Sequence, residues 1–123
     1  MTMRGLTLLA LVACGCGSGD RLFEVTGTVQ FQGQPLPAGQ IFFDPDYLKS
    51  NDGPPGFAFV RDGKFDTRGT GRGVVGGPYK VRIEGFDGKP GNELPLGRPI
   101  CKHEEARVLP RENSAQHFTV PSK

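Results

Sequence analysis

The sequence predicts an all-β domain of about seven short strands, packed as a sandwich of two sheets. Several segments alternate apolar and polar residues with a period of two, which is the pattern of strands with one buried face. Many of the 19 glycines and 11 prolines lie between these segments, where they mark turns. Beyond the first 13 residues, no stretch of ten shows the 3.6-residue hydrophobic period of a helix. Short strands separated by frequent turns are typical of a β-sandwich.

The first predicted strand, 23–31, shows the clearest alternation. It reads Phe-Glu-Val-Thr-Gly-Thr-Val-Gln-Phe, so its odd-numbered positions are apolar or glycine and its even-numbered positions are polar. We therefore expect the odd-numbered side chains in the core and the even-numbered ones in solvent. A turn at 33–39, a second strand at 40–44 and a loop at 45–55 follow.

A tight hairpin is predicted where Asp62 and Gly63 separate the strand-like segments 56–61 and 64–67. The dipeptide Asp-Gly suits a type I′ turn, in which both central residues need a positive φ. A glycine-rich loop then leads to the next predicted strand.

The C-terminal part of the domain is expected to supply three more strands. Segment 79–84 places Tyr, Val and Ile on one face, and a charged stripe of Lys, Arg and Glu on the other, solvated face. A long glycine- and proline-rich loop covers 85–100. Segments 103–109 and 115–121 are expected to form the last pair of strands.

The first sixteen residues have the layout of an export signal. Arg4 precedes an apolar run over 6–13, which is shorter than the roughly 20 residues needed to span a bilayer. The tetrad Leu11-Val12-Ala13-Cys14 resembles the lipobox of bacterial lipoproteins, with a branched residue three positions before the cysteine and a small residue directly before it. That resemblance implies cleavage before Cys14, a diacylglycerol on its thiol and acylation of the new amino group.

This interpretation divides the chain into three parts. Residues 1–13 are the lipoprotein signal peptide, 14–21 a glycine- and serine-rich tether, and 22–121 the β-sandwich. Lipidation at Cys14 makes the membrane the first expected partner and the cell envelope the expected location. Gly15 stands where lipoproteins retained in the inner membrane often have Asp, so the analogy favours the outer membrane.

Composition limits the remaining partners. The nine phenylalanines, in a chain without tryptophan, are expected to supply much of the core. A formal charge of +2, with no basic run longer than two residues, gives no electrostatic footprint for nucleic acid. Cys16 and Cys101 could pair in an oxidising envelope or remain two separate thiols, and the sequence leaves both open.

Five short motifs mark turns and strand starts in the domain. They are Val25-Thr-Gly-Thr-Val29, Gly33-Gln-Pro-Leu-Pro-Ala-Gly39, Ile41-Phe-Phe43, Asp62-Gly-Lys-Phe65 and Gly77-Pro-Tyr-Lys-Val81. Together they resemble the carboxypeptidase regulatory-like domains, a transthyretin-like family of β-sandwiches, and more particularly small envelope lipoproteins of planctomycete bacteria. The resemblance covers about 23–121, although 86–105 is longer than the connection it implies. It implies an accessory sandwich module without catalytic residues.

The segment Gly71-Arg-Gly-Val-Val-Gly76 matches the dinucleotide-binding pattern G-x-G-x-x-G. That chemistry needs a helix to begin there, so that its N-terminal amides meet the pyrophosphate. Here Gly77-Pro78 and a predicted strand follow. We therefore expect a loop, and no nucleotide cofactor.

The loop 44–53 offers oxygen ligands that Ca²⁺ could use. Four oxygen-bearing side chains lie within nine positions: Asp44, Asp46, Asn51 and Asp52. EF-hand spacing is absent, and the same residue types initiate turns around proline and glycine. A solvated turn is the simpler interpretation. Calcium binding by this loop, or glycan binding through its Tyr47, remains the alternative function.

Three side chains form the only nitrogen and sulfur set in the predicted domain: Cys101, His103 and His117. Residues 101 and 103 share one strand face, as a metal site would need. Pairing the last two strands, however, places Arg107 and not His103 opposite His117, and three ligands are too few for a closed zinc site. We therefore expect surface histidines and no metal.

No arrangement of residues indicates catalysis. The serines fall in expected linker, loop or tail segments, and the two histidines provide few general bases. The sequence thus predicts a non-enzymatic, lipid-anchored binding or structural module of the bacterial envelope, without cofactors. Its partner beyond the membrane would be an envelope protein or polymer.

Overall fold

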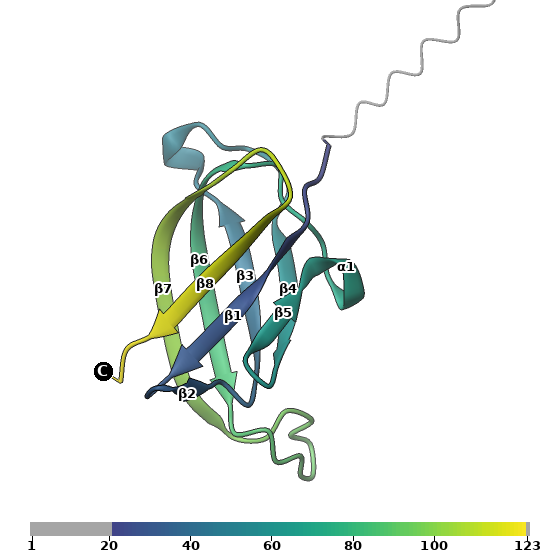
Figure 1. Cartoon of the computed structure of the whole chain (residues 1–123), viewed down its shortest axis with the longest axis vertical. Coiled ribbons are helices and arrows are strands. Elements are labelled where there is room, and N and C mark those ends of the chain that lie inside the picture. Colours follow the sequence, from purple (N-terminus) through teal and green to yellow (C-terminus); the bar gives the residue numbers. More distant parts are fainter. Residues whose placement is uncertain (1–20, 123) are drawn as a thin grey trace, which may run out of the picture.

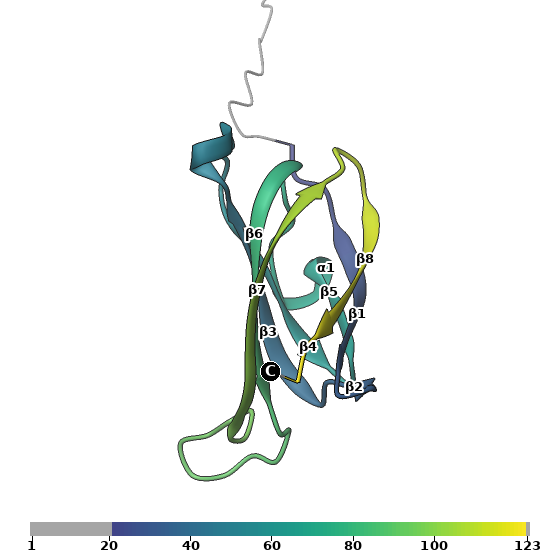
Figure 2. The same cartoon turned by 90° about the vertical axis from the view of Figure 1, so that its left-hand side faces the viewer.

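The fold is described by a computed structural model that covers residues 21–122 (Figures 1 and 2). Cys14, Cys16 and the signal peptide lie outside the described residues, as does most of the predicted tether. Within residues 21–122, no helix is long and apolar enough to cross a membrane.

The protein is all-β, as predicted. Its strands are β1 (Val25–Phe31), β2 (Gln34–Pro35), β3 (Ala38–Pro45), β4 (Gly56–Arg61), β5 (Lys64–Asp66), β6 (Gly77–Phe86), β7 (Pro99–Leu109) and β8 (Ser114–Val120). Two short helical turns accompany them, η1 (Tyr47–Lys49) and α1 (Thr67–Thr70). The hydrophobic period predicted no helix in either segment, because a turn of three or four residues is too short to show that period.

All the strands belong to one curled sheet, mostly antiparallel. Its order is β2-β1-β5-β4-β3-β6-β7, and β8 pairs in parallel with the other side of β1. The sheet folds over so that β1 and β8 face β6 and β7 across the core (Figure 2). The two predicted sheets are therefore the two halves of one continuous sheet, packed against each other. Hydrogen bonding continues around the corner because β4 leads directly into β5, and β5 pairs with β1.

The alternation predicted for 23–31 is confirmed at its centre, although β1 begins at Val25 and Thr26, Thr28 and Phe31 are all half-buried. Val25 and Val29 are fully buried, whereas Gln30 on the opposite face is exposed. The hairpin is confirmed as well, since Asp62 and Gly63 have φ values of 52° and 75°. Its second strand ends at Asp66, one residue earlier than predicted, because α1 begins at Thr67.

The core contains fewer phenylalanines than composition suggests. Of the nine, only Phe43, Phe65 and Phe118 are buried. The rest of the core consists mainly of aliphatic side chains with Tyr79, and Phe57 and Phe59 point outward from β4 with 38% and 40% of their surface exposed. The expectation that phenylalanine supplies much of the core is therefore wrong. Alternation explains this: Phe57 and Phe59 both occupy the outward positions of β4, and Phe42 occupies an outward position of β3 next to the buried Phe43.

The predicted pairing of 103–109 with 115–121 is also wrong. β7 pairs antiparallel with β6, while β8 crosses to the opposite side of the core and pairs in parallel with β1. The register Phe31↔Val120 brings the buried side chains of β8 into the core beside those of β1. β1 and β7 each have an edge to which β8 could bond through its backbone, and sequence spacing alone does not separate these choices.

Candidate functional site

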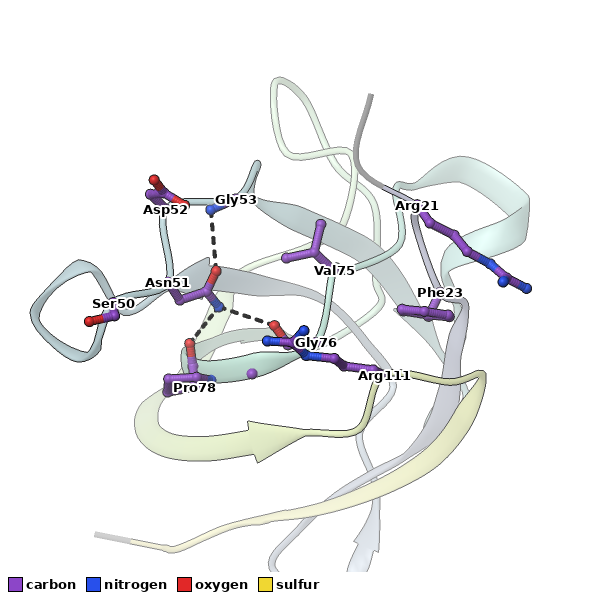
Figure 3. A pocket seen from close by; sticks show the side chains of 11 residues that line it. Arg21, Phe23, Ser50, Asn51, Asp52, Gly53, Val75, Gly76, Pro78 and Arg111 are labelled. Atoms are coloured by element: carbon purple, nitrogen blue, oxygen red, sulfur yellow. Dashed lines mark hydrogen bonds between the residues drawn. The ribbon is translucent and has the colours of Figure 1, made fainter. Parts of the chain in front are cut away.

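A cleft of about 370 Å³ opens at the end of the sheet where the described chain begins (Figure 3). Its walls are the loop 50–53 and the glycine-rich segment 75–78, with Arg21, Phe23 and Arg111 completing the lining. We call it the tether-end cleft. It brings together parts of the two candidate binding segments, 44–53 for calcium and 71–76 for a nucleotide.

Asn51 joins these two segments. Its Nδ2 donates hydrogen bonds to the carbonyl oxygens of Pro78, at 2.7 Å, and Gly76, at 3.4 Å. Its Oδ1 accepts a bond from the Gly53 amide at 3.2 Å, as Figure 3 shows. The side chain is buried, so these bonds replace those that water would make. Asn51 therefore acts as the link that holds the loop against the glycine-rich segment.

The G-x-G-x-x-G segment over 71–76 is a loop, as predicted. β6 begins directly after it, at Gly77, so no helix N-terminus points into the cleft. Gly76 has a φ of 87°, and a Cβ there would lie 3.0 Å from the Arg111 Cα. The glycine therefore permits the close approach of Arg111 to this wall.

Three of the four candidate calcium ligands in 44–53, namely Asp44, Asp46 and Asn51, make hydrogen bonds within the fold. Asp44 accepts a 2.7 Å hydrogen bond from the Nε of Arg82, and this contact raises the pKa of Arg82. Asp46 is buried, and its Oδ1 accepts from the Leu48 amide at 3.2 Å. Asp52 is exposed on the rim of the cleft. Within residues 21–122, no three His, Cys, Asp or Glu side chains come close enough together to hold a metal ion.

Asp46 also shapes the helical turn η1. Its carbonyl oxygen accepts bonds from the amides of Lys49 and Asn51, and its own amide donates to the Pro78 carbonyl at 3.1 Å. The turn ends at Ser50, which is left-handed with a φ of 65°. These bonds hold Tyr47, Leu48 and Lys49 as a projection beside the cleft, which we call the η1 tip.

The cationic groups of the cleft come from separate parts of the chain. Arg21 precedes β1, and its Cζ lies 5.4 Å from the centroid of the Phe23 ring. Arg111 lies in the turn between β7 and β8. Guanidinium groups bind phosphate or carboxylate oxygens, so this end of the domain can receive an anionic group. No local sequence motif links the two arginines, and only the fold brings them to one cleft.

The candidate nitrogen and sulfur ligands do not form one site. Cys101 and His103 share a face of β7, as predicted, but His103 Nε2 lies 3.1 Å from Glu105 Oε1. His117 Nδ1 instead lies 2.8 Å from the hydroxyl of Thr28, in the half of the sheet that β1 and β8 form. Burial raises the pKa of the Cys101 thiol. Each of these side chains therefore has its own surroundings, and the three share no ligand position.

Comparison with protein-family models, with curated proteins and with solved structures returned no match. The resemblance to carboxypeptidase regulatory-like domains therefore stays a prediction.

Proposed function

We propose that this chain is a lipid-anchored, non-catalytic binding or structural module of the bacterial cell envelope. The observation that carries the proposal is the tetrad Leu11-Val12-Ala13-Cys14 after a short apolar run with one preceding positive charge. Cys14 is the residue that receives the lipid, and the all-β domain follows as a carboxypeptidase regulatory-like module. The outer membrane is the favoured location.

The position of Arg21 supports this arrangement. Arg21 lies seven positions after Cys14, and an extended chain spans at most about 3.5 Å per residue, or roughly 25 Å here. The domain is thus held close to the membrane by the end at which the described chain begins (Figure 1), and the residues of the tether-end cleft lie at that end. The opposite end, with the long loop 87–98, is left free to meet an envelope protein or polymer.

The chemistry of the described residues supports a module without catalysis. The ionisable groups that line the tether-end cleft are Arg21, Asp52 and Arg111, a set without a nucleophile and base in the usual catalytic combinations. His103 and His117 lie on β7 and β8 and contact Glu105 and Thr28. Binding is therefore better supported than bond-breaking chemistry.

The alternative, calcium or glycan binding through 44–53, has weaker support. Asp44 is paired with Arg82 and Asp46 caps η1, so a calcium ion would have to replace contacts that shape the loop. Tyr47 is exposed, but a sugar-binding platform usually combines several aromatic faces. A rise in melting temperature with added Ca²⁺ or with cell-wall glycans would favour this alternative.

Metabolic labelling with a radioactive fatty acid tests the proposal in a bacterial host that processes lipoproteins. We expect wild-type chain and Cys16→Ser to take up label and to remain with membranes until detergent is added. Cys14→Ser should take up no label, and should leave the membrane or accumulate as an uncut precursor. Labelling of Cys14→Ser equal to that of wild type would overturn the assignment of Cys14.

A further inference from the structure

We propose that the η1 tip docks onto the phospholipid surface, with Leu48 entering the headgroup–acyl boundary and Lys49 and Arg111 meeting lipid phosphates. This inference rests on the proposed lipid anchor and adds a second contact with the same membrane. It makes the domain lie against the bilayer in one orientation, with the loop 87–98 pointing away.

The first support is that the η1 tip exposes large apolar side chains although hydrogen bonds fix its backbone. Leu48 exposes 91% of its surface and Tyr47 exposes 68%, although both belong to a turn fixed by the buried Asp46 and Asn51. An isolated exposed leucine needs no explanation by itself. Here it lies between an exposed tyrosine and a lysine in η1, a combination suited to the interface between lipid and water.

The second support is the place of the tip relative to the tether. The η1 turn, the start of the described chain and the 110–113 turn all lie at the same end of the molecule (Figure 1). Ser50, directly after the tip, lines the same cleft as Arg21, where the tether ends. Because Arg21 lies only seven positions after Cys14, this end of the domain stays within roughly 25 Å of the anchor, and the tip can reach the membrane.

The charges at this end fit lipid headgroups. Lys49 is adjacent to Leu48 in the tip, and Arg111 and Arg21 flank the cleft. The exposed carboxylates of the same end are Asp52 and Glu112, so the patch is only slightly cationic. This end of the domain therefore suits pairing with individual lipid phosphates, and its net charge is too small for strong attraction to an anionic membrane. Because the tether keeps the tip at high effective concentration near the bilayer, weak contacts of this kind are sufficient for docking.

The chain contains no tryptophan, which allows a direct test with single reporters. The full-length lipoprotein carrying Leu48→Trp is purified in detergent and reconstituted into phosphatidylethanolamine–phosphatidylglycerol vesicles with brominated acyl chains. Its matched control is Leu94→Trp, a leucine 40% exposed in the loop at the opposite end. Flotation of the vesicles is measured in parallel and reports on the lipid anchor alone.

We expect both proteins to float, and brominated lipid to quench Leu48→Trp roughly threefold more strongly than Leu94→Trp, since an interfacial side chain reaches the acyl boundary. Adding Lys49→Glu and Arg111→Glu to Leu48→Trp should reduce the quenching without affecting flotation. Flotation with equal quenching of both reporters would overturn docking. A blue-shifted but unquenched Leu48→Trp would also overturn it, and would assign the tip to a protein contact. Failure to float would overturn the proposed anchor itself.

Discussion

Arg107 of β7 lies over the ring of Phe118 in β8, with its Cζ 3.9 Å from the ring centroid. The same guanidinium donates to the carbonyl oxygen of His117 at 3.0 Å and contacts Glu105 at 2.9 Å. No strand ladder within residues 21–122 joins β7 to β8. Arg107 therefore bridges the two open edges of the curled sheet through its side chain.

Removing this bridge should destabilise the domain. Arg107→Ala loses the cation–π contact and the bond to His117, and we expect the free energy of unfolding to fall by about 2 kcal/mol. Chemical denaturation of purified protein measures the change. Lys102→Ala on the outward face of the same strand is the control, and it should stay within about 0.5 kcal/mol of wild type. Equal losses in the two variants would show that Arg107 has no special role at this seam.

A second prediction concerns the two faces of β1. Val29 is fully buried, so Val29→Asp places a charge in the core and should lower the free energy of unfolding by about 4 kcal/mol or more. Thr28 faces outward toward His117, so Thr28→Asp should change it by less than about 1 kcal/mol. Thermal or urea unfolding of the two variants compares them directly. Similar losses in both would contradict the assigned burial of β1.

Local sequence patterns predicted those strands and turns whose characteristic residues lie within a few positions of one another. Alternation located β1 and β6, and the Asp62-Gly63 pair located the hairpin. The partner of β8 was beyond such reasoning, because the choice between β1 and β7 depends on contacts between segments about 90 residues apart in the chain. The tether-end cleft was hidden for the same reason: Arg21 and Arg111 line one cleft only in the folded domain.

The sequence also left the role of Asn51 unresolved. Its residue type suits either a turn or a calcium ligand, and only the positions of the Gly76 and Pro78 carbonyls decide between these roles. The buried Nδ2 donates to both carbonyls, and Oδ1, the atom that a calcium ion would bind, accepts from the Gly53 amide. Asn51 is therefore a structural link, and the η1 tip depends on it.

A third prediction tests that link. Asn51→Leu keeps the branched shape of the side chain but removes its hydrogen bonds to Gly76, Pro78 and Gly53, and we expect the free energy of unfolding to fall by about 2 kcal/mol. The same change at the exposed neighbour, Asp52→Leu, should have an effect within about 0.5 kcal/mol. Urea unfolding of both variants provides the comparison. A neutral Asn51→Leu would mean that the loop is held in place by other contacts.

Mass spectrometry of the mature N-terminus, isolated from native membranes, tests the central claim most directly. We predict that the first residue is Cys14, carrying a diacylglycerol on its sulfur and an acyl chain on its amino group. Two or three chains are needed for stable anchoring, since each buried CH₂ contributes about 0.8 kcal/mol and one chain alone binds only reversibly. An unmodified peptide that continues through residue 14 would contradict the account.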